Sequence, residues 1–250
     1  GYQKAGILTL LKNWPAYFLA KTVIFPKLKN VFGGNLQYMV GGGALLDIKQ
    51  QQFFYTIGFP IYQGYGLTEA TPIISSNTPF AHKLGTSGFV LPSVKCRIMK
   101  NQNEECEQGE KGEIVILGDN VMKGYLKNKE ASEEVIKNDW LWTGDLGYID
   151  KDGFLVVTGR EKALLIAEDG EKYSPEEIEE GLVSSSHLIH QAMLYNNQKR
   201  FTTSIISLDE QKIRKSSQDK TLNSPSEVLQ AIEQEFKTFK ADPIYKAKFP

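Results

Sequence analysis

The stretch that most constrains the fold runs from Trp142 to Glu180, where a turn, a strand and a helix start follow one another. Residues 154–158 are β-branched and aromatic, which predicts a strand. Upstream of it, a tight glycine-containing turn ends in the carboxylate of Asp145. Downstream, Ser-Pro-Glu-Glu at 174–177 predicts a helix start, with Ser174 as N-cap in a capping box closed by Glu177.

Composition excludes several classes of protein. Hydrophobic residues make up 41% of the 250 residues and charged residues 24%, as in ordinary globular proteins with one or two domains. A net charge of -1 gives no electrostatic case for binding nucleic acid or an anionic membrane, so we expect at most peripheral membrane association. Cys96 and Cys106 lack redox or zinc spacing, which favours two reduced thiols in a cytoplasmic protein.

A glycine triplet follows the first expected strand, residues 36–40. Gly41-Gly42-Gly43-Ala44 would let a ligand approach the backbone closely. The same residues could equally form a sharp turn into the helix expected at 47–57. The triplet alone leaves both interpretations open.

A second loop follows the strand expected at 60–63. It reads Gly64-Tyr65-Gly66-Leu67-Thr68-Glu69. Ligands of α/β proteins bind at the carboxyl ends of strands. At such a place a threonine hydroxyl can donate to a phosphate, a glutamate can hold Mg²⁺, and a tyrosine ring can stack on a purine.

Residues 1–32 are expected to be helical, with Pro15 and Pro26 as boundaries. Later in the chain the pattern changes twice. From about 83 to 158, short apolar runs alternate with turn residues, which predicts a small distorted β-barrel or sandwich. After Lys162 the mixture of strands and amphipathic helices predicts a small α+β domain, including a helix that starts with a second capping box at 224–227. The polar segment 212–220 is expected to be a solvated connection.

The ordered set of motifs, from YGLTE at 65–69 through TGD at 143–145 to GREK at 159–162, resembles the adenylate-forming superfamily of acyl-CoA synthetases. By that resemblance Asp145 and Arg160 hold the ribose hydroxyls of ATP, and Lys162 is the hinge of a mobile C-terminal domain. An isolated TGD would indicate only a turn.

The resemblance also assigns the remaining site residues. Thr68 contacts a phosphate and Glu69 binds Mg²⁺, while Tyr65 stacks on adenine between two motif glycines, Gly64 and Gly66. Gly170 lines the path of the CoA pantetheine, and Lys172 contacts a phosphate. The adenine and acyl pockets are lined by Gly42, Gly43 and Ala44. Two departures from the family pattern are Leu45, where proline is common, and Ala163, where an acidic or amide residue is common.

The implied fold class is α/β and α+β. Residues 1–159 would be the end of a large adenylate-forming domain, with β-α-β layers and a barrel-like subdomain at about 83–158. Residues 160–250 would form most of the small mobile C-terminal domain. The family's phosphate loop and its late catalytic lysine have no counterpart here, so we expect a piece of a longer chain that is inactive alone.

The implied function is that of a long-chain fatty acid–CoA ligase. A fatty acid carboxylate attacks the α-phosphate of Mg·ATP to give acyl-AMP and pyrophosphate, and the thiol of CoA then displaces AMP. Two alternatives stay open. One is an acyl-AMP ligase that loads a carrier protein, and the other is a non-catalytic acyl or nucleotide binder.

Overall fold

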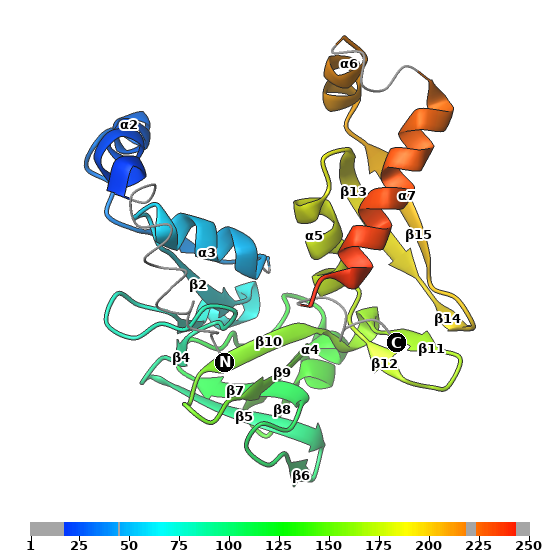
Figure 1. Ribbon diagram of the computed structural model, residues 1–250. Coiled ribbons are helices and arrows are strands. Elements are labelled where there is room, and N and C mark those ends of the chain that lie inside the picture. Colours follow the sequence, from blue (N-terminus) through cyan, green and yellow to red (C-terminus); the bar gives the residue numbers. More distant parts are fainter. Residues whose placement is uncertain (1–17, 45, 219–223, 244–250) are drawn as a thin grey trace.

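The computed structural model describes residues 18–44, 46–218 and 224–243, with the side chains of Glu177 and residues 216–218 left aside. The expected helical stretch before residue 18, and Leu45, therefore lie outside the described residues. The chain forms two groups of elements, each around its own apolar core, and β10 leads from the first into the second (Figure 1). No helix in the described part of the chain is long and apolar enough to cross a membrane.

The first helical segment corrects one prediction, because Pro26 does not end it. A π-helical turn, η1 (Ala20–Ile24), continues directly into α2 (Phe25–Val31), with Pro26 in the first turn of α2. The Phe25 N–H donates to the carbonyl oxygen of Ala20, five residues back. Proline has no N–H to donate to a helical hydrogen bond. The change from π-helical to α-helical hydrogen bonding therefore falls next to the residue that would have interrupted a continuous α-helix.

The first sheet has four strands in the order β1-β2-β3-β4. β1 and β2 are parallel and joined through α3, and the other pairs are antiparallel. Asp47 caps α3, because its carboxylate accepts from the Lys49 N–H at 2.9 Å. The elements are β1 (Met39–Gly41), α3 (Ile48–Thr56), β2 (Ile61–Gly66), η2 (Thr68–Ala70), β3 (Ile73–Ser76) and β4 (Phe89–Val90).

The predicted barrel-like region is a six-stranded antiparallel sheet in the order β10-β9-β7-β5-β6, with β8 paired to β9. Its inward side chains, among them Ile114, Ile116 and Leu155, pack against Ile74 of the first sheet. Two backbone bonds of 2.8 Å join Leu155 to Ser87 and Gly88, which precede β4. The elements are β5 (Val94–Asn101), β6 (Glu104–Glu105), β7 (Gly112–Gly118), α4 (Lys129–Val135), β8 (Ile136–Lys137), β9 (Trp140–Ile149) and β10 (Leu155–Arg160).

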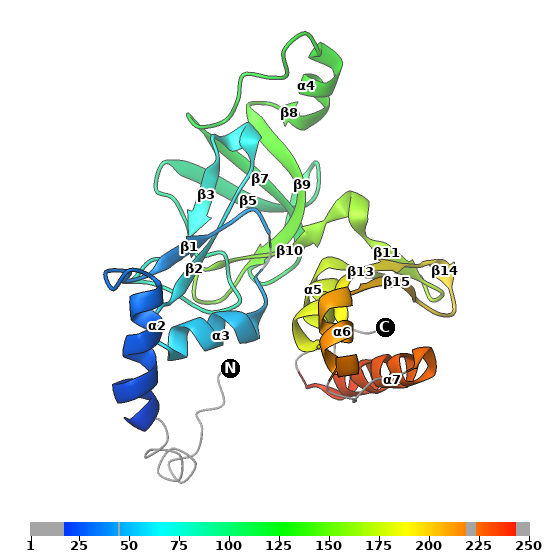
Figure 2. The ribbon, with the colours of Figure 1, turned by 90° about the horizontal axis from the view of Figure 1, so that it is seen from above.

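The rest of the chain is the predicted α+β unit, in which α5 and α7 cover the β13–β15 pair (Figures 1 and 2). Its core includes Ile178, Leu182 and Phe239. The elements are η3 (Glu161–Ala163), β11 (Leu165–Ala167), β12 (Lys172–Tyr173), α5 (Glu176–Ser185), β13 (Ile189–Tyr195), β14 (Asn197–Lys199), β15 (Thr203–Leu208), α6 (Glu210–Gln218) and α7 (Pro225–Ala241).

Two predictions in this unit are wrong and one is confirmed. α5 begins at Glu176, and the Ser174 hydroxyl donates to the Glu176 carboxylate, so it does not cap the helix. The polar segment expected to be a connection contains α6, whose i,i+4 pair of Arg214 with Glu210 suits an exposed helix. Ser224 does cap α7, where its hydroxyl accepts from the Glu227 N–H at 3.3 Å.

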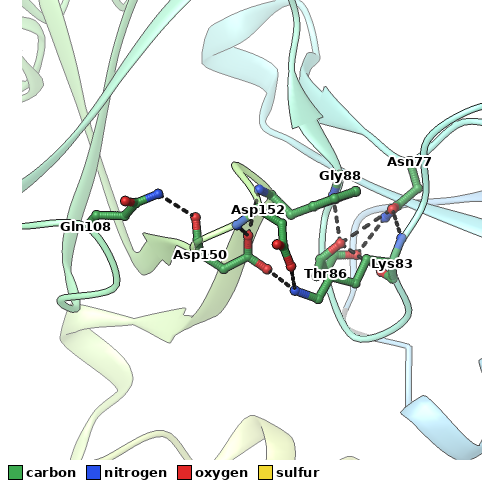
Figure 3. A network of polar contacts seen from close by, with 8 residues as sticks. Asn77, Lys83, Thr86, Gly88, Gln108, Asp150 and Asp152 are labelled. Atoms are coloured by element: carbon green, nitrogen blue, oxygen red, sulfur yellow. Dashed lines mark hydrogen bonds and ion pairs between the residues drawn. The ribbon is translucent and has the colours of Figure 1, made fainter. Parts of the chain in front are cut away.

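A polar network fastens the loop between β3 and β4 to both sheets (Figure 3). The Asn77 amide donates to the carbonyl oxygens of Gln63 and Thr86, at 2.9 and 2.8 Å, and its oxygen accepts from the Lys83 N–H. The Lys83 ammonium lies 2.6 Å from carboxylate oxygens of both Asp150 and Asp152, in the β9–β10 turn. The loop is therefore held between β2 and the β9–β10 hairpin.

Asn77→Ala should lower the free energy of unfolding by about 2–4 kcal/mol, because it removes the four hydrogen bonds of a side chain that is 5% exposed. Urea unfolding measures the change. Asn103→Ala, at an exposed asparagine, is the control and should stay within about 0.5 kcal/mol. Equal losses in both variants would show that the buried amide contributes nothing specific.

Candidate functional site

A pocket of about 170 Å³ lies where the ends of β1, β2 and β10 meet β9. It brings together most of the residues singled out from the sequence, although they come from segments more than a hundred residues apart. Its lining consists of Gly43, Ala44, Gln63, Gly64, Tyr65, Gly66, Ser87, Asp145, Val157, Thr158, Gly159, Arg160 and Glu176.

Thr143-Gly144-Asp145 corrects the predicted tight turn, because these residues lie inside β9, where its pairing with β7 shifts register, and they place a carboxylate in the wall of this pocket. Gly144 has φ of +70°, a left-handed conformation that glycine adopts without strain. The Thr143 hydroxyl donates to the carbonyl oxygen of Ile114 at 2.7 Å, and the Gly144 N–H donates to the Glu113 carboxylate at 2.9 Å. β7 thus fixes this segment of β9, and Asp145 is only 5% exposed.

Each oxygen of the Asp145 carboxylate has a partner from a different strand. The Tyr65 hydroxyl, on β2, donates to Oδ2 at 2.6 Å, and the Arg160 Nε, on β10, lies 3.0 Å from Oδ1. Burial, and secondarily the negative charge of Asp145, hold the pKa of Tyr65 far above its ordinary value. Tyr65 is therefore a neutral donor, and the carboxylate is oriented from both sides.

The glycines of this site have different physical roles. A Cβ on Gly66 would lie 1.8 Å from the carbonyl oxygen of Pro72, so Gly66 is required by the packing of β2 on β3. A Cβ on Gly43 would meet nothing within 4 Å, and its φ of +85° belongs to the turn after β1. The glycine triplet is thus both a turn and a pocket wall, which joins the two interpretations left open above.

Gln63 is a site residue that sequence reasoning missed. Its side chain is 5% exposed, and its amide donates to the carbonyl oxygen of Ala44 at 2.7 Å. Its side-chain oxygen is buried without a hydrogen-bond partner in the structure. An unsatisfied buried acceptor in a pocket wall fits a ligand with an N–H or O–H donor. The available signal was a glutamine inside a buried strand, two residues before Tyr65.

The other predicted residues lie outside the lining of this pocket. Thr68 and Glu69 follow in η2, Lys162 is in η3, and Gly42 follows β1. Gly170 and Lys172 lie in the second group of elements, where Gly170 has φ of +85° and Lys172 is exposed on β12. The Lys162 ammonium is 3.7 Å from the carboxylate of Glu134, and both side chains are largely exposed.

The side-chain partner of the Glu69 carboxylate among the described residues is the Tyr125 hydroxyl, which donates to Oε1 at 2.8 Å. Among the described residues, no three His, Cys, Asp or Glu side chains gather as a metal cage. A lone carboxylate nevertheless suits Mg²⁺, which keeps several waters and binds through one or two carboxylates together with substrate phosphates.

Two family models match the chain. One, described as AMP-binding enzyme, matches residues 9–126, and the other, described as AMP-binding enzyme C-terminal domain, matches residues 162–241. The chain is 33% identical over 187 residues to the long-chain-fatty-acid–CoA ligase FadD15 of Mycobacterium bovis, covering 75% of this chain and 29% of that protein. The chain spans between a quarter and a third of the length of such relatives.

Two further relatives differ in what they act on. A long-chain-fatty-acid–[acyl-carrier-protein] ligase of Arabidopsis thaliana is 33% identical over 205 residues, covering 77% of this chain and 28% of that protein. The solved structure of O-succinylbenzoate coenzyme A synthetase from Bacillus subtilis, in complex with ATP and magnesium ion, is 34% identical, with a TM-score of 0.61 over 68% of this chain and 36% of that one. The predicted mixed α/β fold class is confirmed.

The raised pKa of Tyr65 predicts a pH-dependent contribution to stability. A tyrosine whose pKa is higher in the folded state stabilises the fold below the unfolded pKa, near 10, and loses this contribution as pH rises above that value. Tyr65→Phe should therefore cost about 1.5–3 kcal/mol at pH 8 and less at pH 11, measured by urea unfolding. Tyr195→Phe, at an exposed tyrosine, is the control. A cost that stays constant over this range would contradict the prediction.

Proposed function

We propose that this chain, which belongs to the family of AMP-binding, adenylate-forming enzymes, supplies the nucleotide site of a ligase that activates a fatty acid carboxylate with ATP. The observation that carries the proposal is the Asp145 carboxylate, buried in a pocket wall and oriented by Tyr65 and Arg160. A fixed, desolvated carboxylate is a strong acceptor for vicinal hydroxyls, which is what a ribose presents.

The other residues that line the pocket support the proposal that an adenine binds there. The unpartnered oxygen of Gln63 fits the exocyclic amine of the base, while the Tyr65 ring and the exposed backbone of Gly43 and Ala44 supply flat surfaces. In the proposed arrangement Asp145 and Arg160 bind the ribose. Thr68 donates to a phosphate from the turn that follows β2.

Mg²⁺ would be held by Glu69 together with phosphates of ATP, and it would neutralise charge as pyrophosphate leaves. The first proposed reaction forms a bond between a carboxylate oxygen of the fatty acid and the α-phosphorus, and breaks the bond to the β-phosphate. In the second, a thiol sulfur attacks the acyl carbon, AMP leaves, and the thiol proton is lost. This chain contributes orientation and electrostatic complementarity.

The acceptor thiol is proposed to be that of CoA, because FadD15 of Mycobacterium bovis, to which this chain is 33% identical over 187 residues, is a CoA ligase. The second candidate is the thiol of an acyl carrier protein, favoured by the similarly strong likeness to the Arabidopsis ligase. Incubating the full-length protein with fatty acid, Mg·ATP and either CoA or acyl carrier protein, and detecting the acyl thioester by mass spectrometry, separates the two.

We further propose that residues 1–159 and 160–250 are two domains, and that Lys162 is the hinge between them. The separate apolar cores on either side of η3 support the division. Rotation about Lys162 would present two faces of the small domain in turn. Gly170, with no side chain, would line the pantetheine path, and the exposed Lys172 would contact a phosphate.

The nucleotide proposal is tested by calorimetry on the full-length protein with ATP and with 2′,3′-dideoxy-ATP. The wild type should bind ATP at least about tenfold more tightly, because charge-assisted hydrogen bonds to hydroxyls are lost in the analogue. Asp145→Ala should abolish most of that preference, whereas Asp119→Ala, at an exposed aspartate, should retain it. An undiminished preference in Asp145→Ala would remove Asp145 from the ribose site.

The hinge is tested by comparing the two half-reactions in Lys162→Pro. Proline fixes φ near −65°, so the small domain should be held in one orientation. Thioester formation from pre-made acyl-AMP should then fall far more than ATP–pyrophosphate exchange. Lys162→Ala removes only an exposed side chain and serves as the control. Equal losses of both half-reactions in Lys162→Pro would count against rotation at this residue.

A further inference from the structure

Four hydrogen bonds join residues 120–125, a segment that we call the clip, to the turn that carries Glu69. Three of the four involve backbone groups of that turn or of the clip. They are Asn120 Nδ2 to the Ala70 oxygen at 2.8 Å, Thr71 Oγ1 to the Asn120 oxygen at 2.7 Å, and the Met122 N–H to the Glu69 oxygen at 2.8 Å. The fourth joins side chains, from the Tyr125 hydroxyl to Glu69 Oε1 at 2.8 Å.

The clip holds a turn that would be unfavourable without support. Thr71, which ends η2, has φ of +54°, a left-handed conformation that β-branched residues rarely adopt. Its hydroxyl bond to the Asn120 carbonyl oxygen ties that strained residue to the clip. The position of Glu69 is thus determined both by η2, which follows β2, and by the segment before α4.

Tyr125 is itself fixed by α4. Its N–H group donates to the Ser132 hydroxyl at 2.8 Å, and that hydroxyl donates to the Asn128 carbonyl oxygen at the start of the helix. A Cβ on Gly124 would lie 2.9 Å from the Ser132 hydroxyl oxygen, so only glycine lets the chain pass this close. The backbone of Tyr125 is therefore held by α4 while its hydroxyl donates to Glu69.

We propose that Tyr125 is a positioning residue that holds one oxygen of Glu69 and so directs the other toward Mg²⁺. The inference rests on the proposed role of Glu69 as the Mg²⁺ ligand. A glutamate side chain has several rotatable bonds, and ordering it in advance removes part of the entropy lost when a metal binds. Tyr125 touches neither metal nor nucleotide in this account and acts only through Glu69.

The test is the Mg²⁺ dependence of ATP binding, measured by calorimetry, together with that of ATP–pyrophosphate exchange, both on the full-length protein. Tyr125→Phe keeps the ring and removes the donor, so the half-saturating Mg²⁺ concentration should rise about tenfold, with most activity restored by excess Mg²⁺. Ser132→Ala should shift it less and in the same direction. Tyr55→Phe, at an exposed tyrosine on α3, is the matched control and should leave the Mg²⁺ dependence unchanged.

Glu69→Gln separates the inference from the function on which it rests. The supporting result is a raised Mg²⁺ requirement in Glu69→Gln that Tyr125→Phe does not raise further in the double variant. If Glu69→Gln alters the Mg²⁺ dependence while Tyr125→Phe and Ser132→Ala stay within twofold of the wild type, Tyr125 has no positioning role. If Glu69→Gln also leaves it unchanged, Glu69 is not the ligand, and both the metal assignment and the inference are overturned.

Discussion

The structure around the pocket depends on one buried carboxylate shared by three strands. Asp145 on β9 accepts from Tyr65 on β2 and pairs with Arg160 on β10. One charged group therefore links the parallel β1–β2 layer to the antiparallel sheet. A carboxylate that is 5% exposed is costly unless both of its oxygens are satisfied. Tyr65 and Arg160 stabilise this buried charge and also orient the carboxylate in the pocket wall. For this reason Asp145 is the proposed ribose-binding residue.

The loop between β3 and β4 is a second link between β2 and the β9–β10 hairpin. Asn77 binds the backbone of Gln63, and Lys83 bridges the two aspartates of the β9–β10 turn (Figure 3). Gln63, whose carbonyl oxygen accepts from Asn77, and Ser87, in the same loop, both line the pocket. The loop therefore helps to position residues of the pocket wall. We expect a change in the loop to alter the geometry of the proposed nucleotide site.

Local patterns predicted several elements, since strands such as β7 and β10 alternate or run apolar and Ser224 is a strong helix cap, but they indicated a turn where β9 runs. The motifs also indicated Tyr65, Asp145 and Arg160. Local patterns and motifs could not predict contacts between residues that are far apart in the sequence. Gln63 became visible only through its bond to Ala44, and Ser174 turned to Glu176 although its local sequence favours a cap. The bonding of Tyr125 to Glu69, across 56 positions, has no local signature.

The most direct measurement for the central claim is a crystal structure of the full-length protein with AMP bound. The account predicts density for the ribose with both hydroxyls within hydrogen-bond distance of Asp145, and the base amine facing the side-chain oxygen of Gln63, beside the ring of Tyr65. A nucleotide bound elsewhere, with the Asp145 carboxylate still held only by Tyr65 and Arg160, would contradict it.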